Sequence, residues 1–304
     1  MTNRRNFIKQ AGMAGVLYSV GHAPWFTDQP ELTRLTILHT NDVHSRIDPF
    51  PDDGSRNAGA GGAVRRAQLI EKIRSEEQHV LLLDAGDIFQ GTPYFNFYGG
   101  ELEMKLMSEM GYDAATIGNH DFDAGINGLE KQLVHADFPL VISNYNFSNT
   151  IMRGKTKPHI IKEYDGIKIG ITGVGIELDG LVPKILYKET QYLDPIRSAQ
   201  EQAHILRHDK GCDMVICLSH LGYKYDDNKV SDMWLAMDSE DIDIIIGGHT
   251  HTFLRRPEMT RNIKGDRVIV NQVGWAGIML GRLDIVFEKN KKGKCVTCSN
   301  TLIT

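Results

Sequence analysis

Five short polar clusters, each after an apolar run, constrain this 304-residue chain more than any other feature. The clusters read TNDVH, DAGD, GNHDFD, SH and GGHTH, at residues 40–44, 84–87, 118–123, 219–220 and 247–251. The runs before them (RLTIL, HVLLL, DAATI, MVICL and DIDIII) have the length and composition of buried strands. Ligands of α/β sheets bind beyond the carboxyl ends of the strands, so we expect the five clusters to share one crevice.

The rest of the pattern predicts an α/β fold. Helices are expected at 63–77, 101–110, 127–135 and 196–207. Strands are expected at 34–40, 79–83, 113–117, 139–142, 160–164, 167–173, 213–218, 242–246, 267–273 and 281–287. Asp165-Gly166 predicts a tight hairpin turn, and a further turn is expected between the last two strands. Strands and helices alternate in the first half of the chain, and hairpins follow toward its end. This order favours mixed sheets with helices on the outside, in a single domain over residues 34–304.

The composition is that of an ordinary soluble globular protein. Apolar residues make up 41% and charged residues 24%, and the net charge is −5. This charge gives no general attraction to nucleic acid or to anionic lipid, so a nucleic acid polymer is not an expected partner.

Residues 1–33 are predicted to be an export signal and a linker. Arg4-Arg5 precedes the weakly apolar stretch AGMAGVLYSVG, which at eleven residues is too short to span a bilayer as a helix. The segment resembles a twin-arginine signal, which predicts a periplasmic or cell-envelope protein. The alternative is a basic N-terminus without a targeting role. The cleavage site is poor because Pro24 follows Ala23, and an uncleaved signal would be the expected contact with membrane.

The four cysteines leave their chemistry open. Cys212 and Cys217 flank an apolar run, whereas Cys295 and Cys298 form a CxxC near the C-terminus. A lone CxxC has no second pair for a zinc site and no strand-to-helix context for a redox motif. A local disulfide and a pair of plain thiols both remain alternatives.

The polar clusters contain typical metal ligands. They supply four imidazoles, two carboxylates and one amide, from Asp42, His44, Asp87, Asn119, His220, His249 and His251. Seven ligands exceed what one catalytic transition metal needs, and they suit two ions that share a carboxylate. The imidazoles favour Mn, Fe, Zn or Co over Mg or Ca. Each cluster alone could be a turn or a hydrogen-bonded histidine, but five in order at strand ends favour a metal centre.

Two other stretches carry weaker signals. The glycine-rich stretch 59–66 lacks a complete phosphate-binding motif and is interpreted as a flexible, closely packed loop, with contact to substrate as the alternative. The aromatic residues of the PYFNFY segment (Tyr94, Phe95, Phe97 and Tyr98) are expected to pack in the core, with a place in the wall of the site as the alternative.

The series DVH, GD, GNHD, SH and GHTH resembles the signature of the calcineurin-like metallophosphoesterases. TNDVHS, DAGDIFQGTP and GNHDFDAG look like the 5′-nucleotidase branch, whose motifs run NDxHG, GDxxQGT and GNHEFD. The resemblance covers residues 35–286. It implies a four-layer αββα sandwich with two central mixed sheets, and hydrolysis of phosphoesters.

The resemblance also implies which residues hold each metal. Asp42, His44 and His251 would hold the first ion, Asn119, His220 and His249 the second, and Asp87 would bridge them. Asp121 stands where the branch has a glutamate, and Ser45 replaces a glycine, but neither is a ligand position. Some nucleotidases have glutamine at the position of His251, and histidine is an adequate ligand there.

In the implied mechanism, two cations acidify a water, and the resulting hydroxide attacks phosphorus in line. His120 stands outside the ligand set and would assist the leaving group as an imidazolium. A neighbouring carboxylate should raise its pKa. Asp123 is favoured over Asp121 for this task, because the branch uses the aspartate three positions after the histidine.

The substrate is less constrained than the chemistry. Nucleotides are the first expectation, with 2′,3′-cyclic phosphodiesters, UDP-sugars and thiosulfate esters as alternatives. A non-catalytic metal-binding subunit of a split nucleotidase is disfavoured, because His120 and the full ligand set are present. Nucleotidases of this branch usually carry a C-terminal substrate domain, which is expected to be absent here. A separately encoded protein with that domain is therefore a predicted partner.

Overall fold

The computed structural model describes the backbone of residues 32–288 and 294–304, and the side chains of the same residues except 294–296. The expected export signal at residues 1–33 lies almost wholly outside the described residues, as does the side chain of Cys295.

The first sheet has five strands in the order β13-β12-β1-β2-β3. The first three strands in chain order run parallel, and they are β1 (Leu32–Thr40), β2 (Val80–Asp84) and β3 (Ala114–Ala115). The antiparallel hairpin of β12 (Met279–Glu288) and β13 (Lys294–Leu302) extends the sheet beyond β1. The sheet is therefore mixed.

The second sheet has six strands in the order β10-β11-β9-β8-β6-β5. Four parallel strands form its centre: β6 (Ile167–Gly175), β8 (Met214–His220), β9 (Ile244–Gly247) and β11 (Arg267–Asn271). The edges are antiparallel and consist of β5 (His159–Tyr164) and β10 (Glu258–Arg261). Asp165 and Gly166 have φ angles of 49° and 81°, as the predicted hairpin turn between β5 and β6 requires.

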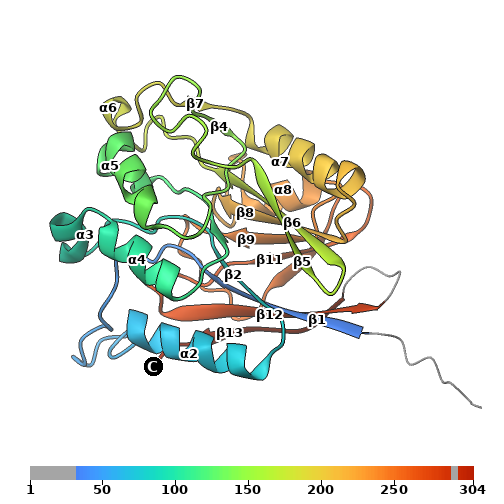
Figure 1. Ribbon diagram of the computed structural model, residues 1–304, viewed down its shortest axis with the longest axis horizontal. Coiled ribbons are helices and arrows are strands. Elements are labelled where there is room, and N and C mark those ends of the chain that lie inside the picture. The colour runs from blue at the N-terminus through green and yellow to red at the C-terminus, as the bar shows by residue number, and fades with distance from the viewer. Residues whose placement is uncertain (1–31, 289–293) are drawn as a thin grey trace, which may run out of the picture. The chain divides into compact units, whose positions relative to one another are not determined.

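The two sheets pack face to face, with helices on both outer sides (Figure 1). Successive side chains of a strand point to opposite faces of its sheet, which explains this arrangement. In β8, Ile216 and Leu218 join the apolar layer between the sheets, whereas Val215 and Cys217 face the outer helices. The predicted four-layer αββα sandwich with two mixed sheets is confirmed.

The helices divide between the two outer layers. The first sheet is covered by α2 (Ala63–Glu76), α4 (Glu101–Glu109) and α5 (Gly125–Gln132), and the second by α7 (Pro195–His204) and α8 (Asp232–Asp238). Shorter elements complete the fold: α3 (Pro93–Tyr98), β4 (Tyr145–Asn146), α6 (Lys184–Tyr187), β7 (Gln191–Tyr192) and the turns η1 (His120–Phe122), η2 (Leu133–His135) and η3 (Ile205–Asp209).

Two sequence predictions about strands are wrong. The strands predicted at 267–273 and 281–287 do not form neighbours, because β11 belongs to the second sheet and β12 to the first. The segment between them crosses from one sheet to the other instead of making a hairpin. The strand predicted at 139–142 makes only isolated bridges through Leu140 and Val141. Its apolar residues reflect burial between layers and not pairing along a strand.

Two further observations bear on the earlier expectations. Within the described ranges, no helix has the length and apolarity needed to cross a membrane. Cys212 and Cys217 are buried free thiols, whereas Cys298 is disulfide-bonded.

Candidate metal centre

The five polar clusters meet in one place, as their positions after strands predict. Three come from the first sheet and two from the second, and they face each other across the carboxyl ends of β1, β2, β3, β8 and β9. His220 Nε2 from β8 lies 3.0 Å from Asp87 Oδ2, which follows β2. His251 Nε2, which follows β9, lies 3.4 Å from Asp42 Oδ1, which follows β1. The crevice is thus formed jointly by the two sheets.

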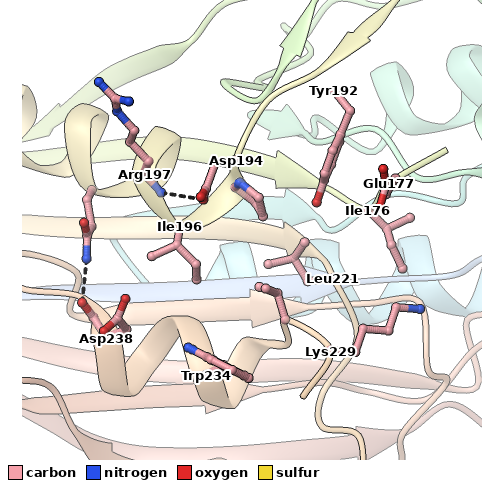
Figure 2. Close-up of a pocket in the computed structure, with 13 residues that line it drawn as sticks. Ile176, Glu177, Tyr192, Asp194, Ile196, Arg197, Leu221, Lys229, Trp234 and Asp238 are labelled. Carbon is pink, nitrogen blue, oxygen red and sulfur yellow. Dashed lines mark hydrogen bonds between the residues drawn. The ribbon is translucent and has the colours of Figure 1, made fainter. Parts of the chain in front are cut away.

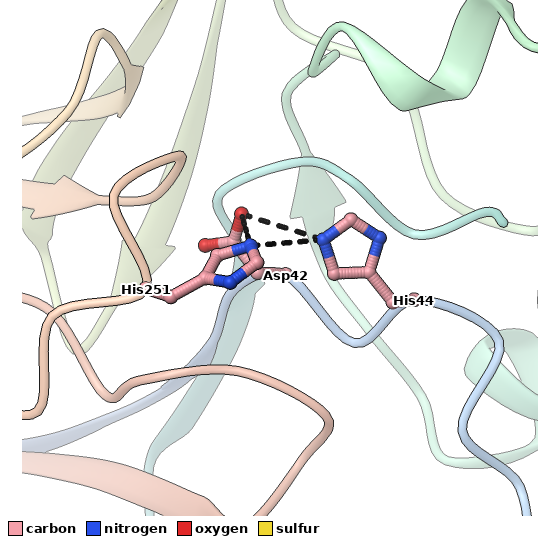
Figure 3. Close-up of side chains that lie close together, drawn as sticks. All are labelled: Asp42, His44 and His251. Carbon is pink, nitrogen blue, oxygen red and sulfur yellow. Dashed lines mark hydrogen bonds and ion pairs between the residues drawn. The ribbon is translucent and has the colours of Figure 1, made fainter. Parts of the chain in front are cut away.

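One group of potential ligands consists of Asp42, His44 and His251 (Figure 3). The Nε2 atoms of His44 and His251 lie 3.0 Å apart, and Asp42 Oδ1 lies 3.4 Å from His251 Nε2 and 4.0 Å from His44 Nε2. Two donors on one tetrahedral zinc-like ion, each at about 2.0–2.2 Å from it, are separated by roughly 3.3–3.6 Å, which lies within the range of these distances. The three side chains can therefore hold one ion with little rearrangement.

The second group consists of Asp87, His220 and His249, with Asn119 beside them. Asn119 Oδ1 lies 2.9 Å from His249 Nδ1. Asp87 Oδ2, besides its contact with His220, lies 3.8 Å from His44 Nε2 in the first group. Its position between the two groups is the one expected of a bridging carboxylate.

Backbone carbonyls orient two of the imidazoles toward the centre. His220 Nδ1 lies 2.7 Å from the carbonyl oxygen of Ala85, and His44 Nδ1 lies 3.2 Å from that of Phe89. Such contacts fix the tautomer and leave Nε2 free for a metal. His220 Nε2 is fully buried and faces two carboxylates, with Asp87 Oδ2 at 3.0 Å and Asp42 Oδ1 at 3.9 Å. A buried imidazole nitrogen that faces carboxylates, with the other ring nitrogen held by a backbone carbonyl, fits a metal site.

The ligand loops have a strained backbone. Asp42, His44, Asp87, His249 and His251 all have positive φ, between 50° and 72°. Residues other than glycine rarely adopt this conformation, and when they do they are concentrated at functional sites. This strained conformation lets short loops turn their side chains toward the candidate metal centre.

One glycine is required by close approach. A Cβ atom on Gly118 would lie 2.2 Å from Asp87 Oδ1 and 2.5 Å from the Asp87 backbone nitrogen. The turn after β3 can therefore approach the bridging position only without a side chain. This explains the glycine at the start of the GNHD cluster in terms of packing.

Burial controls the charge of the histidines. It lowers the pKa of His44, and it lowers the pKa of His249 to about 4. Both rings are therefore neutral near pH 7, as metal ligands must be. Burial also opposes charge on His220 and Asp87, but the attraction between the two groups outweighs the effect of burial. This attraction raises the pKa of His220 to about 10 and lowers the pKa of Asp87. A cation bound there would take the place of the His220 proton.

The two acids after His120 have different surroundings. His120 Nδ1 lies 2.8 Å from Asp123 Oδ2, and this hydrogen bond raises the pKa of His120. Asp121 accepts four backbone N–H groups, from Gly118, Asp87, Ile88 and Phe89. The expected contact between His120 and Asp123 is present, and Asp121 instead joins two of the ligand loops.

Sequence reasoning missed two neighbours of the centre. Asn41 is buried, and its Nδ2 donates to Asp42 Oδ2 and to the Gly274 carbonyl, both at 2.6 Å. Trp275 stacks on His251 with ring centroids 5.7 Å apart and an angle of 7°. The amide in TNDVH was a visible signal for the first, whereas the segment around Trp275 matched no motif.

Two cavities lie near the centre without containing it. The larger, of about 620 Å³, is lined by residues such as Tyr192, Leu221 and Trp234 (Figure 2). None of the seven potential ligands, nor His120 or Asp123, lines it. Leu221 directly follows His220, so the cavity adjoins the end of β8.

The smaller cavity, of about 380 Å³, is lined by Arg46, Tyr94, Phe97 and Tyr98, among others. Phe97 is 80% exposed and Tyr98 is 53% exposed, so core packing was wrongly expected for them. The segment forms the short helix α3, which turns only Phe95 into the core. The other aromatic rings consequently lie on the surface beside the loop that follows His44.

Comparison with known proteins places the chain in a family. The sequence model of a family described as "Calcineurin-like phosphoesterase" matches residues 35–253, which is well over half of the chain. The chain belongs to the calcineurin-like phosphoesterase family. The family resemblance inferred from the five clusters is thus confirmed.

Relatives narrow the resemblance to one branch. Over 292 residues the chain is 34% identical to the snake venom 5′-nucleotidase of Gloydius brevicauda, covering 88% of this chain and 47% of that protein. The solved 5′-nucleotidase precursor of Thermus thermophilus is 30% identical with a TM-score of 0.80, over 90% of this chain and 55% of that one. The solved NAD nucleotidase of Haemophilus influenzae is 27% identical with a TM-score of 0.79, over 90% of this chain and 50% of that one. The chain spans about half the length of the curated relatives it matches.

Proposed function

We propose that this chain hydrolyses phosphate monoesters, with 5′-nucleotides as substrates, using two divalent metal ions. The observation that carries the proposal is the placement of Asp87 between two groups of ligands, with His120 beside them. The names of the relatives, most of which are 5′-nucleotidases, support the choice of substrate.

The ligand set fits two ions of the Mn, Fe, Zn or Co class. Asp42, His44 and His251 would hold one, Asn119, His220 and His249 the other, with Asp87 shared. When bound, such a pair supplies an acidified water and neutralises charge on the phosphoryl oxygens. The chain's own contribution is to hold seven donors rigidly, through strained loops and backbone carbonyls, before substrate arrives.

His120 would act on the leaving group. Its side chain is 40% exposed and lies against the His44 ring, with centroids 5.2 Å apart. Asp123 holds Nδ1, so Nε2 is the nitrogen that can donate a proton to the departing oxygen. The charge on the imidazolium would also offset charge that develops on the phosphoryl group.

The test is hydrolysis by metal-replete protein. The chain is stripped with a chelator, reloaded with Mn²⁺, Zn²⁺ or Co²⁺, and assayed on AMP, p-nitrophenyl phosphate and bis-p-nitrophenyl phosphate, with bound metal counted by mass spectrometry. We expect AMP turnover with two ions per chain and none after stripping. His120→Asn should lower kcat by about 10²–10⁴-fold without changing the metal count. His135→Asn, in the remote turn η2, serves as the control.

Other results would contradict the proposal in different ways. Preference for bis-p-nitrophenyl phosphate or for a 2′,3′-cyclic nucleotide would indicate a phosphodiesterase, and preference for a UDP-sugar or a thiosulfate ester would change the substrate class. Absence of turnover with two ions bound would indicate a non-catalytic metal-binding subunit. Equal activity of His120→Asn and wild type would exclude the role proposed for His120.

Export and the predicted partner with a C-terminal nucleotidase domain remain predictions. Export can be tested by fusing residues 1–33 to a reporter that is active only after it is exported in the folded state. We expect export of the fusion and its loss when Arg4 and Arg5 are both replaced by lysine. Equal export of both fusions would contradict the twin-arginine interpretation.

A further inference from the structure

We propose that His204, His208 and Asp241 form a third metal site, for Zn²⁺, at the ends of β8 and β9 opposite to the candidate metal centre. The inference does not depend on the proposed function. It rests on a group of two imidazoles and one carboxylate whose ligand atoms all lie within 4.8 Å of one another. None of these residues belongs to the polar clusters that form the candidate metal centre.

The distances suit one tetrahedral ion. Asp241 Oδ2 lies 3.0 Å from His208 Nε2 and 3.9 Å from His204 Nδ1. Donors about 2.0–2.2 Å from a zinc ion are roughly 3.3–3.6 Å apart at the tetrahedral angle, and this range lies between the two observed separations. Small rotations of the histidine side chains would bring all three atoms to bonding distance. The two imidazole centroids are already only 4.5 Å apart.

The local fold brings the histidines together. His204 is the last residue of α7, and His208 lies one turn later in η3, where the backbone takes a π-helical form. Residues four apart lie on the same helical face. Short π-helical segments are rare and frequently occur at functional sites. The widened turn closes with Lys210 N donating to the Ile205 carbonyl oxygen at 3.0 Å.

The surroundings hold the carboxylate in place and leave room for an ion. Asp241 is 13% exposed, whereas His204 and His208 are 66% and 49% exposed. Lys264 Nζ lies 4.0 Å from the other carboxylate oxygen, Oδ1, so Oδ2 remains directed at the histidines. Arg207 donates to the Asp241 carbonyl oxygen at 3.2 Å and fixes the turn.

A cavity beside the group can provide the remaining ligand. It has a volume of about 400 Å³ and is lined by His204 and Asp241 together with Arg197, Gln200, Glu201 and Glu240. Water in this cavity can complete a four-coordinate shell. Two imidazoles and one carboxylate favour Zn²⁺ over Mg²⁺ or Ca²⁺, which prefer oxygen ligands throughout.

An ion here would link the starts of two central strands. The segment after η3 leads into β8 at Met214, and Asp241 lies shortly before β9 at Ile244. At their other ends these strands lead to the candidate metal centre, because His220 ends β8 and His249 follows β9. At the rise of a strand, Met214 and His220 are roughly 20 Å apart. The site would therefore have a structural role. Bound zinc would stabilise the folded chain, and the stabilisation would grow with the logarithm of the ratio of free zinc to the dissociation constant of the site.

The experiment compares zinc binding of the full chain with that of two single variants, His204→Asn and His208→Asn. Chelator-stripped proteins are dialysed to equilibrium against increasing free Zn²⁺, and bound zinc is counted by mass spectrometry. We expect each variant to bind less zinc than wild type, by up to one equivalent, at the lowest concentration that saturates wild type. Because even loss of an outer-shell partner weakens metal binding about 10–100-fold, affinity at this site should fall at least about tenfold. His135→Asn is the matched control and should bind as wild type does.

This difference between wild type and each variant does not depend on how many ions the candidate metal centre binds. A second readout is the melting temperature with and without zinc, since part of the zinc-dependent rise should disappear in both variants. The replaced side chains are largely exposed, so the metal-free melting temperatures should match that of wild type. Equal zinc binding by wild type and both variants would overturn the proposal, as would an equal loss in His135→Asn.

Discussion

At the scale of single residues, the two aspartates after His120 show how neighbouring identical side chains can serve different tasks. Asp123 lies within hydrogen-bond reach of His120 Nδ1 and is partly exposed. Asp121 is buried, and both of its oxygens accept backbone N–H groups, two at each oxygen. One acid is therefore placed to position the proposed proton donor, and the other to fix the loops that carry ligands.

We predict that amide substitutions will separate these tasks. Asp123→Asn should lower kcat and shift the alkaline limb of the pH profile to lower pH. The reason is that the hydrogen bond with Asp123 raises the pKa of His120, and the proposed donor is the imidazolium, which exists below that pKa. The melting temperature should hardly change. Steady-state kinetics on AMP against pH, with thermal denaturation alongside, measure both effects.

Asp121→Asn should have the opposite effect, since it should lower the stability of the fold more than it lowers kcat. Whichever way the amide is oriented, its NH₂ group must face two backbone N–H groups. Each donor left without an acceptor costs about 1–3 kcal/mol, so the free energy of unfolding should fall by several kcal/mol. If Asp121→Asn proved as stable as wild type while Asp123→Asn unfolded, the assignment of the two roles would be reversed.

At the scale of elements, the candidate metal centre depends on a contact between two loops. Asn41, after β1, donates to the Gly274 carbonyl, and its Oδ1 accepts from Val273 N at 2.9 Å. Residue 42 also contributes, since Ala276 N donates to its carbonyl oxygen at 2.7 Å. The crossover from β11 to β12 is thereby bound to the loop that carries two potential ligands.

We predict that Asn41→Ala will weaken both the fold and metal binding. The substitution leaves the Val273 N–H and the Gly274 carbonyl unpaired, which should cost roughly 3 kcal/mol of the free energy of unfolding. It also removes a donor to Asp42, so affinity for the first ion should fall about 10–100-fold. Urea denaturation and equilibrium dialysis measure the two effects. Asn146→Ala, which removes an exposed contact with Gln191, is the control and should change neither.

Elements also show what could be predicted from sequence and what could not. The strand ends and their clusters were predictable because the hydrophobic pattern and the composition of a strand are properties of a short stretch of sequence. Parallel strands also bring their carboxyl ends to one edge of the sheet. The crossover between β11 and β12 was not predictable, because a turn signal does not say whether the next strand joins the same sheet. Asn41 was missed for the same reason, since its partners lie more than 230 residues along the chain.

At the scale of the whole molecule, one polar side chain stands out in the apolar layer between the two sheets. His39 follows Leu35 and Ile37 on the inner face of β1 and is fully buried. Its Nε2 accepts a hydrogen bond from Asn271 Nδ2 of the second sheet at 2.7 Å, whereas Nδ1 has no partner among the described residues. Burial lowers the pKa of His39 to about 3, so the folded chain keeps this ring neutral at moderately acidic pH.

We predict that His39 makes the fold sensitive to acid. In the unfolded chain the pKa of His39 returns to about 6.5. Below that pH the unfolded state therefore binds a proton that the folded state does not bind. Between pH 7 and pH 5 this should remove roughly 2 kcal/mol from the free energy of unfolding. His39→Gln removes the titrating group, so the stability of wild type relative to the variant should fall by that amount over this range. Urea denaturation at several pH values, with chelator present throughout so that metal release plays no part, measures the difference. His159→Gln, on the edge strand β5, should show a much smaller change. A difference between wild type and His39→Gln that stays constant with pH would mean that His39 accepts its proton while still folded between the sheets.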